Sequence, residues 1–181
     1  MKTTPEQIDL WRSSPSEHQR LEFKEAKVQF DNRTLFKYCV AIANEGGGFL
    51  VLGVADKPPR PVVGTAAFND PVAMAGKLFE AVGFRVDIEE VVHAAGRVLV
   101  FHIPSRPRGT AYHFDGAYLM RAGQQLVPMT NQTLRERFGL SDEKTALVSQ
   151  AISAAVAAGK IKPAEETKIS ARYRSYVPFW A

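Results

Sequence analysis

Several features that would place this protein in a familiar class are scarce or absent. The chain has one cysteine, Cys39, in 181 residues, so neither an internal disulfide nor a cysteine-based zinc site can form within it. No apolar run approaches the ~18 residues needed to span a bilayer. The first residues also lack the basic-then-apolar pattern of a secretory signal peptide. From these absences we expect a cytoplasmic protein with no membrane partner.

The glycine motifs of nucleotide-hydrolysing enzymes are missing as well. Neither G-x-x-x-x-G-K-[ST] nor a G-x-G-x-x-G after a strand occurs. The run Gly46-Gly-Gly48 follows an apolar helix, whereas a phosphate cradle lies at a helix N-terminus. We interpret these glycines as a helix stop, with Gly46 or Gly47 in the left-handed conformation. The remaining glycines also allow the close approach of a nucleic-acid backbone.

The stretch from Ala41 to Asp56 is the centre of the chain. The helix predicted to end at Asn44 carries one apolar face, formed by Leu35, Phe36, Cys39, Val40 and Ala43. The run 49–54 is apolar on both faces, which predicts a central strand covered on both sides. Asp56 follows that strand, on a rigid scaffold where a site can be held accurately.

The other segments complete an α+β fold, a mixed β-sheet flanked by helices. Helices are expected at 5–14, from Asp31 or Asn32 to Asn44, from Asn69 or Asp70 to Gly83, and from Thr130 or Asn131 to Phe138. The third of these should bury Val72, Ala75, Leu78, Phe79 and Val82. Strands are expected at 19–26, 49–54, 84–92 and 97–103, from Val62 to Thr65, and in a hairpin over 112–121.

The sequence predicts a main domain at 1–139 and a smaller unit at 140–181. In the smaller unit Ser141 caps an apolar helix that Gly159 ends. A basic, aromatic tail follows, which is either part of a winged-helix-like unit or a strap docked on the main domain.

Positive charge gathers late in the chain, although the formal net charge is only +4. Arginine accounts for much of it, and the planar guanidinium suits bidentate contacts with phosphate. We therefore expect any nucleic-acid affinity to depend on Arg106, Arg108 and Arg121. The alternative is that these arginines only keep a surface soluble.

Three carboxylates and one ammonium group are predicted to meet at the edge of the sheet. Glu17 precedes the first strand, Glu22 and Lys24 lie on its polar face, and Asp56 ends the central strand. We expect these carboxyl groups within ~8 Å of each other, close enough to share one Mg²⁺ or Mn²⁺ ion. The alternative is a solvated strand face, which is the commoner fate of charged residues.

Three blocks of the sequence resemble the AlbA-type domain of Schlafen proteins. They are Glu17-His-Gln-Arg-Leu-Glu-Phe-Lys24, the whole stretch from Ala41 to Asp56, and Tyr118-Leu-Met-Arg-Ala-Gly123. The resemblance implies a mixed sheet with flanking helices that binds nucleic acid. It also implies a metal-dependent endoribonuclease that cuts transfer or ribosomal RNA, because Glu17, Glu22 and Asp56 match the family's catalytic carboxylates one by one. Lys24 would then offset charge on the scissile phosphate.

Two departures from that family keep other functions open. The zinc site of eukaryotic Schlafens cannot be rebuilt here, and this chain has one lobe where those proteins have two. Bacterial relatives are described as DNA-binding regulators, so the main alternative is a non-catalytic DNA-binding regulator; a protein-interaction module is a third. We also expect a homodimer, because pairing would restore a two-lobed cleft, with the tail from Tyr176 to Trp180 as its contact.

Overall fold

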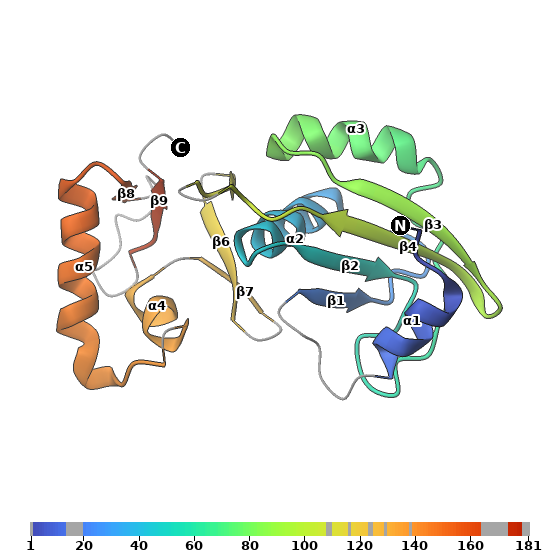
Figure 1. The fold of residues 1–181 in the computed structure, drawn as a ribbon. Helices are drawn as coiled ribbons and strands as arrows, with labels where there is room; N and C mark the ends of the chain where they lie inside the picture. The colour runs from blue at the N-terminus through green and yellow to red at the C-terminus, as the bar shows by residue number, and fades with distance from the viewer. Residues whose placement is uncertain are drawn as a thin grey trace.

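The computed structural model describes residues 2–13, 20–107, 110–115, 117–122, 125–128, 130–137, 139–163 and 174–178. The predicted α+β fold is confirmed: a four-stranded mixed sheet carries helices on its faces, and smaller elements follow it (Figure 1). The helices are α1 (Pro5–Arg12), α2 (Asn32–Asn44), α3 (Pro71–Val82), α4 (Asn131–Arg137) and α5 (Thr145–Ala157), with a 3₁₀ turn η1 (Asp142–Lys144). The strands are β1 (Leu21–Lys24), β2 (Gly48–Leu52), β3 (Asp87–His93), β4 (Gly96–Ile103), β5 (His113–Phe114), β6 (Ala117–Ala122), β7 (Gln125–Pro128), β8 (Ile161–Pro163) and β9 (Tyr176–Pro178).

The main sheet has the order β1-β2-β4-β3, so β1 is an edge strand and β2 is internal. Strand β1 runs parallel to β2, whereas the other pairs are antiparallel. Along β2 the side chains alternate between two cores: Leu50 and Leu52 pack toward α2 and α3, and Val51 packs toward α1. The apolar run 49–54 is thus covered on both sides, as predicted.

The glycine run ends α2 and aligns β2 beside β1. Gly46 and Gly47 adopt positive φ angles of 96° and 80°, which confirms the predicted helix stop. Gly48 also has a positive φ, of 153°, and a Cβ there would lie only 2.1 Å from the carbonyl oxygen of Arg20. A glycine is therefore required where β2 begins to pair with β1.

Two predictions about the segment between β2 and β3 are wrong. Helix α3 begins after Asp70 and ends before Gly83 as expected, but its buried residues are Met74, Leu78 and Val82. Val72 and Phe79 are instead 83% and 55% exposed, because the helix lies with its other flank on the sheet. No strand forms from Val62 to Thr65: Val62 makes one isolated bridge to Val54, and Gly64 turns the chain with a φ of 73°.

A second sheet, β5-β6-β7, lies between the main sheet and the C-terminal elements (Figure 1). Its first two strands are the predicted hairpin around Asp115, and β7 was not foreseen. Strand β6 contacts α2 on one side and β9 on another. The aromatic hairpin is therefore fixed against the helix that ends at the glycine turn.

The C-terminal elements are two helices followed by two strands, β8 and β9, which pair antiparallel. The side chain of Asn131 on α4 donates to Thr145 O at 3.1 Å and to Ser149 Oγ at 2.8 Å, and Arg135 pairs with Asp142. These contacts join α4 to α5 across the boundary expected after residue 139, so the division into two domains stays a prediction. Within the described ranges, no helix is both long and apolar enough to cross a bilayer.

Candidate functional site

Strand β1 carries Glu22 and Lys24 on the face of the sheet that α2 covers. Their register partners on β2 are Leu50 and Leu52, which belong to the α2-side core. Glu22 is consequently 0% exposed, although alternation along the strand predicted a polar face open to solvent. Alternation identifies which residues share a face, but a helix packed over that face decides whether it is buried.

The ammonium group of Lys24 bridges two carboxylates. Lys24 Nζ lies 2.8 Å from Glu22 Oε1 and 2.7 Å from Asp56 Oδ2, and 5.3 Å from the centre of the Tyr38 ring. The second oxygen of Asp56 accepts from the backbone N–H of Glu25 at 3.1 Å. Because both carboxylates touch one nitrogen, they lie within the ~8 Å expected for groups that share an ion. Glu17, the third predicted carboxylate, lies outside the described residues.

Lys24 is held in its charged form. Burial alone would lower its pKa, but the hydrogen bonds to Asp56 and Glu22 outweigh burial and raise the pKa of Lys24 above its ordinary value. The side chain is only 20% exposed, so little water competes for it. At neutral pH it is therefore a fixed cation that can contact an anionic group but cannot act as a general base.

The Lys24–Asp56 pair opens into a hollow of about 490 Å³. Its wall includes the aromatic ring of Phe30 and the exposed residue Lys57. The Asp56 side chain is 43% exposed, whereas Glu22 is buried behind Lys24. An incoming ligand would thus meet two carboxylates, Asp56 and Glu25, and two lysines before it met Glu22.

The chemistry of this site partly fits a divalent cation. Carboxylate oxygens from Glu22 and Asp56 are the hard ligands that Mg²⁺ and Mn²⁺ prefer. However, Lys24 Nζ lies between those oxygens, so an ion bound by both would require the ammonium to shift. Among the residues that the structure describes, no cluster of three or more His, Cys, Asp or Glu side chains is placed to hold a metal. Glu17, which lies outside the described residues, is the third ligand that the sequence predicted.

The three arginines predicted to contact nucleic acid differ in what the structure shows of them. Arg106 Nε donates to Asn44 O at 3.1 Å and its Nη1 donates to Thr110 O at 2.6 Å, so this side chain fastens the loop after β4. Arg108 lies outside the described residues. Arg121 is on β6, and its side chain is not among those that the structure describes. The role of these arginines in binding stays a prediction.

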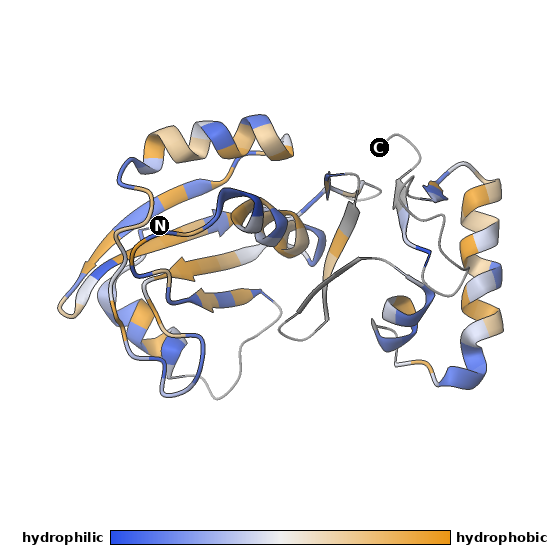
Figure 2. Cartoon of the chain, turned by 180° about the vertical axis from the view of Figure 1, so that it is seen from behind, coloured by the Kyte–Doolittle hydropathy of each residue, from blue (hydrophilic) through white to orange (hydrophobic). Residues whose placement is uncertain are grey.

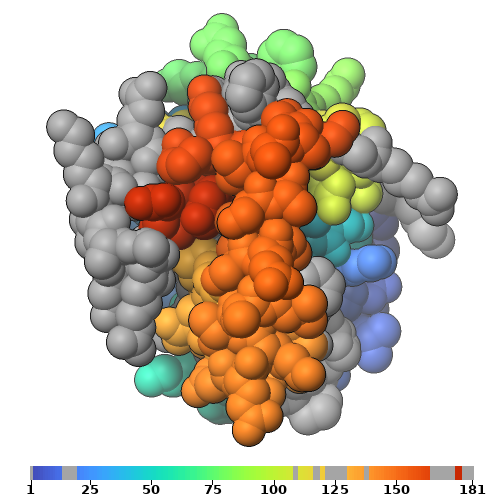
Figure 3. Space-filling view, turned by 90° about the vertical axis from the view of Figure 1, so that its left-hand side faces the viewer, coloured from blue at the N-terminus to red at the C-terminus, as the bar shows by residue number. Residues whose placement is uncertain are grey.

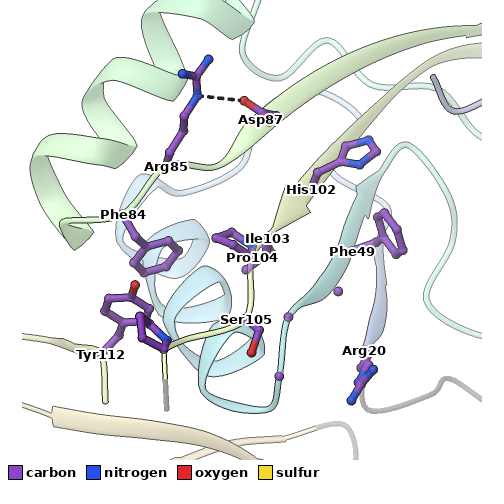
Figure 4. A pocket seen from close by; sticks show the side chains of 14 residues that line it. Arg20, Phe49, Phe84, Arg85, Asp87, His102, Ile103, Pro104, Ser105 and Tyr112 are labelled. Atoms are coloured by element: carbon purple, nitrogen blue, oxygen red, sulfur yellow. Dashed lines mark hydrogen bonds and ion pairs between the residues drawn. The ribbon is translucent and has the colours of Figure 1, made fainter. Parts of the chain in front are cut away.

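A second hollow, of about 790 Å³, lies where β1 and β2 begin, at the end of these strands opposite to the Lys24 site (Figure 4). The sequence did not predict it. Cationic and aromatic side chains line it: Arg20, Arg85, His102, Phe49, Phe84 and Tyr112. The rings of Phe84 and Tyr112 stack with centroids 4.2 Å apart. Rings beside cations are the usual composition of a surface that contacts single-stranded nucleic acid.

Arg20 is the cation of this second hollow that is best placed for a ligand. Arg85 pairs with Asp87 at 3.1 Å (Figure 4), whereas no ion pair joins Arg20 to any other described residue. The Arg20 guanidinium lies over the glycine turn, where a Cβ on Gly46 would come within 3.3 Å of it. The sequence contained one signal that could have identified Arg20: it alternates with apolar residues in step with Glu22 and Lys24 on the same predicted strand.

Fold and site together define an α+β domain with a buried carboxylate–lysine pair at one edge of a mixed sheet. The family described as Schlafen, AlbA_2 matches residues 17–130, so this chain belongs to that family. Membership points to interaction with nucleic acid, as the resemblance of the three blocks implied.

Two solved structures are similar to the chain. The DIP2311 protein of Corynebacterium diphtheriae aligns with a TM-score of 0.55 and 18% identity over 73% of this chain and 31% of that one. This likeness supports the fold, and the alignment spans less than a third of the other protein. The N-terminal domain of a RecG-related protein of Nitrosomonas europaea aligns with a TM-score of 0.45 and 18% identity over 69% of this chain and 92% of that one. No curated protein matches the sequence.

Proposed function

We propose that this protein binds nucleic acid and acts as a divalent-metal-dependent endoribonuclease on structured RNA. The observation that carries the proposal is the bridge of Lys24 between buried Glu22 and accessible Asp56, at the edge of an open hollow. Burying a carboxylate beside a cation has a desolvation cost that the ion pair seldom repays in stability. Their position beside a hollow is typical of a functional site.

The residues of the site divide the work between them. Lys24 keeps its proton, so it offers a positive charge to a phosphate oxygen of the strand to be cut. Asp56 is fixed by the Glu25 N–H and faces the hollow, where it can orient a water molecule. Glu22 holds Lys24 from behind. Contact with a phosphate would draw Lys24 forward and free carboxylate oxygens for a cation.

A divalent ion held by Glu22, Asp56 and Glu17 would polarise the phosphodiester and lower the pKa of a bound water. The oxygen-only donor set favours Mg²⁺ or Mn²⁺ over zinc.

A non-catalytic DNA-binding regulator is the second candidate. The order of the C-terminal elements, two helices and then the antiparallel pair β8–β9, supports a winged-helix-like unit. Against this candidate, α5 carries no Lys or Arg between Thr145 and Ala157, and helices that enter DNA grooves usually contact phosphates through such residues.

The test is cleavage of a structured RNA, such as a transfer RNA transcript, with Mn²⁺ or Mg²⁺ and with EDTA. Asp56→Asn keeps an acceptor for the Glu25 N–H but removes the charge, so cleavage should fall by roughly two orders of magnitude or more. Glu80→Gln, an exposed carboxylate on α3, is the matched control and should cleave normally.

RNA binding by both variants should be measured in parallel, by fluorescence anisotropy in EDTA. Cleavage that persists in EDTA, or that Asp56→Asn leaves intact, would refute the nuclease. Absence of cleavage together with tight binding of duplex DNA would favour the regulator instead.

A further inference from the structure

Helix α5 lies on the outside of the molecule and carries no charge. No Asp, Glu, Lys or Arg occurs from Thr145 to Gly159, and only Val148 and Ile152 of the helix are buried. Figure 2 shows hydrophobic and near-neutral colours along α5, with hydrophilic residues gathered where it begins. Figure 3 shows the helix running across the front of one face of the molecule.

An exposed helix of this composition is unusual. Surface helices usually carry charged residues on the outer side, whereas the exposed polar residues of α5, among them Ser149, Gln150 and Ser153, are all uncharged. The exposed residues of α5 and its C-cap, Ala158, include an apolar seam with the 4-3-4 spacing of a coiled-coil contact. The members of this seam are Leu147, Ala151, Ala154 and Ala158.

A groove beside the seam enlarges the apolar surface. It has a volume of about 370 Å³ and lies between α4, α5 and β8, with almost entirely apolar walls. Leu147 lines the groove and is 55% exposed. Two other walls are Leu134 of α4 and Ile161 of β8. Seam and groove together form a continuous apolar face, which marks an interaction surface.

We propose that this face pairs with the same face of a second copy of the chain, with the two α5 helices antiparallel about a two-fold axis between Ala151 and Ala154. Small residues at the centre let two helices approach closely. Two-fold pairing uses one patch twice and closes the assembly at a dimer.

The charges at the two ends of α5 favour a second copy of the chain as the partner and an antiparallel orientation of the two helices. Asp142 and Glu143 are exposed just before the helix, and Lys160 follows it, with Lys162 two residues further on. Antiparallel pairing places the acidic end of one copy against the lysines of the other, whereas parallel pairing would bring like charges together. Lys144 and the contact of Asp142 with Arg135 reduce this attraction, so Glu143 carries most of it.

This interface differs from the one expected from the sequence, which used Tyr176 to Trp180. Strand β9 contains Tyr176 and pairs with β8 of its own chain, while Phe179 and Trp180 lie outside the described residues. The new interface is independent of the proposed nuclease, because the Lys24 site lies at the edge of the main sheet.

The experiment is light scattering of the full chain at micromolar concentrations. Wild-type protein should have twice the monomer mass, and Ala154→Glu should have the monomer mass, since the change buries a charge in the seam. Ser153→Glu introduces the same charge on the same helix away from the seam and should stay dimeric. Circular dichroism checks that each variant is folded; Leu147→Lys, at an exposed position, is the second seam variant.

Charge reversal tests the direction of pairing. Glu143→Lys should raise the dissociation constant of an antiparallel dimer several-fold, and adding Lys162→Glu should restore it. In a parallel dimer Glu143→Lys would exchange one like-charge pair for another and change little. A monomeric wild type, or a dimer that neither Ala154→Glu nor Leu147→Lys disrupts, would overturn the proposal.

Discussion

The side-chain amide of Asn44 hydrogen-bonds the backbone of Tyr112 in both directions. Asn44 Nδ2 donates to Tyr112 O at 2.8 Å, and Tyr112 N donates to Asn44 Oδ1 at 2.9 Å. The same Nδ2 also donates to Leu119 O at 2.9 Å. Asn44 is the last residue of α2 and only 8% exposed. One amide therefore fastens the β5–β6 hairpin to the helix end that precedes the glycine turn.

Replacing this amide should loosen the hairpin. Asn44→Leu keeps the branched shape of the side chain but removes its polar atoms and leaves three backbone groups without this partner, so we expect a loss of about 2–4 kcal/mol in the free energy of unfolding. Asn32→Ala, exposed at the start of the same helix, should change it by less than about 0.5 kcal/mol. Urea unfolding measures both. Amide exchange at Leu119 that stays slow in Asn44→Leu would contradict the assignment.

Lys24 should contribute to stability mainly by keeping Glu22 from being a lone buried charge. Lys24→Met is expected to cost about 2–3 kcal/mol, because a carboxylate would remain buried without its cation. Adding Glu22→Gln should recover much of that loss without restoring cleavage. Lys27→Met, whose exposed pair with Glu25 contributes little, is the control. Recovery of cleavage in the double variant would remove Lys24 from the proposed chemistry.

The raised pKa of Lys24 predicts how this contribution varies with pH. The folded-state pKa exceeds the unfolded value of about 10.4, so the stabilisation is fully present below that value. It is lost only as pH rises through the folded-state pKa. The difference in unfolding free energy between wild type and Lys24→Met should thus stay constant from pH 7 to about 10. A decrease already near pH 8 would show that the ammonium is not held as described.

The sequence predicted best where local rules decide the structure. Asp31 and Asp70 cap α2 and α3 as expected, since each accepts from a backbone N–H three residues later. Local sequence patterns did not indicate how segments far apart in the chain pack together. The burial of Glu22 depends on α2, and the loop-fixing bonds of Arg106 depend on Asn44 and Thr110. Charge in the sequence indicates neither whether a residue is covered nor which backbone atoms it meets.

Gly48 should tolerate no side chain. Its Cβ would lie 2.1 Å from Arg20 O, a backbone atom that cannot move without breaking the β1–β2 register. We expect Gly48→Ala to lose more than about 3 kcal/mol of stability. Gly76→Ala is the matched control, because a Cβ at this α3 position meets nothing within 4 Å. It should stabilise the helix by roughly 0.5–1 kcal/mol. Equal thermal unfolding of the two variants would contradict the close approach.

Arg20 should bind a phosphate of single-stranded RNA. In the described structure it forms no ion pair, lies over the glycine turn, and borders the second hollow with the stacked rings of Phe84 and Tyr112. Each phosphate neutralised on a single strand contributes about 0.7 to the slope of log K against log salt. Arg20→Gln should therefore reduce that slope by about 0.7, measured by anisotropy with an oligouridylate in the Asp56→Asn background.

Arg85→Gln is the control for that measurement, because Arg85 is already paired with Asp87 and its side chain is 87% exposed. Its effect on the slope should be smaller than that of Arg20→Gln. Arg106→Gln should lower stability rather than the slope, since Arg106 bonds Asn44 O and Thr110 O. If Arg106→Gln flattened the slope while Arg20→Gln left it unchanged, the RNA would contact the arginines expected from the sequence, Arg106, Arg108 and Arg121. The second hollow would then have no part in binding.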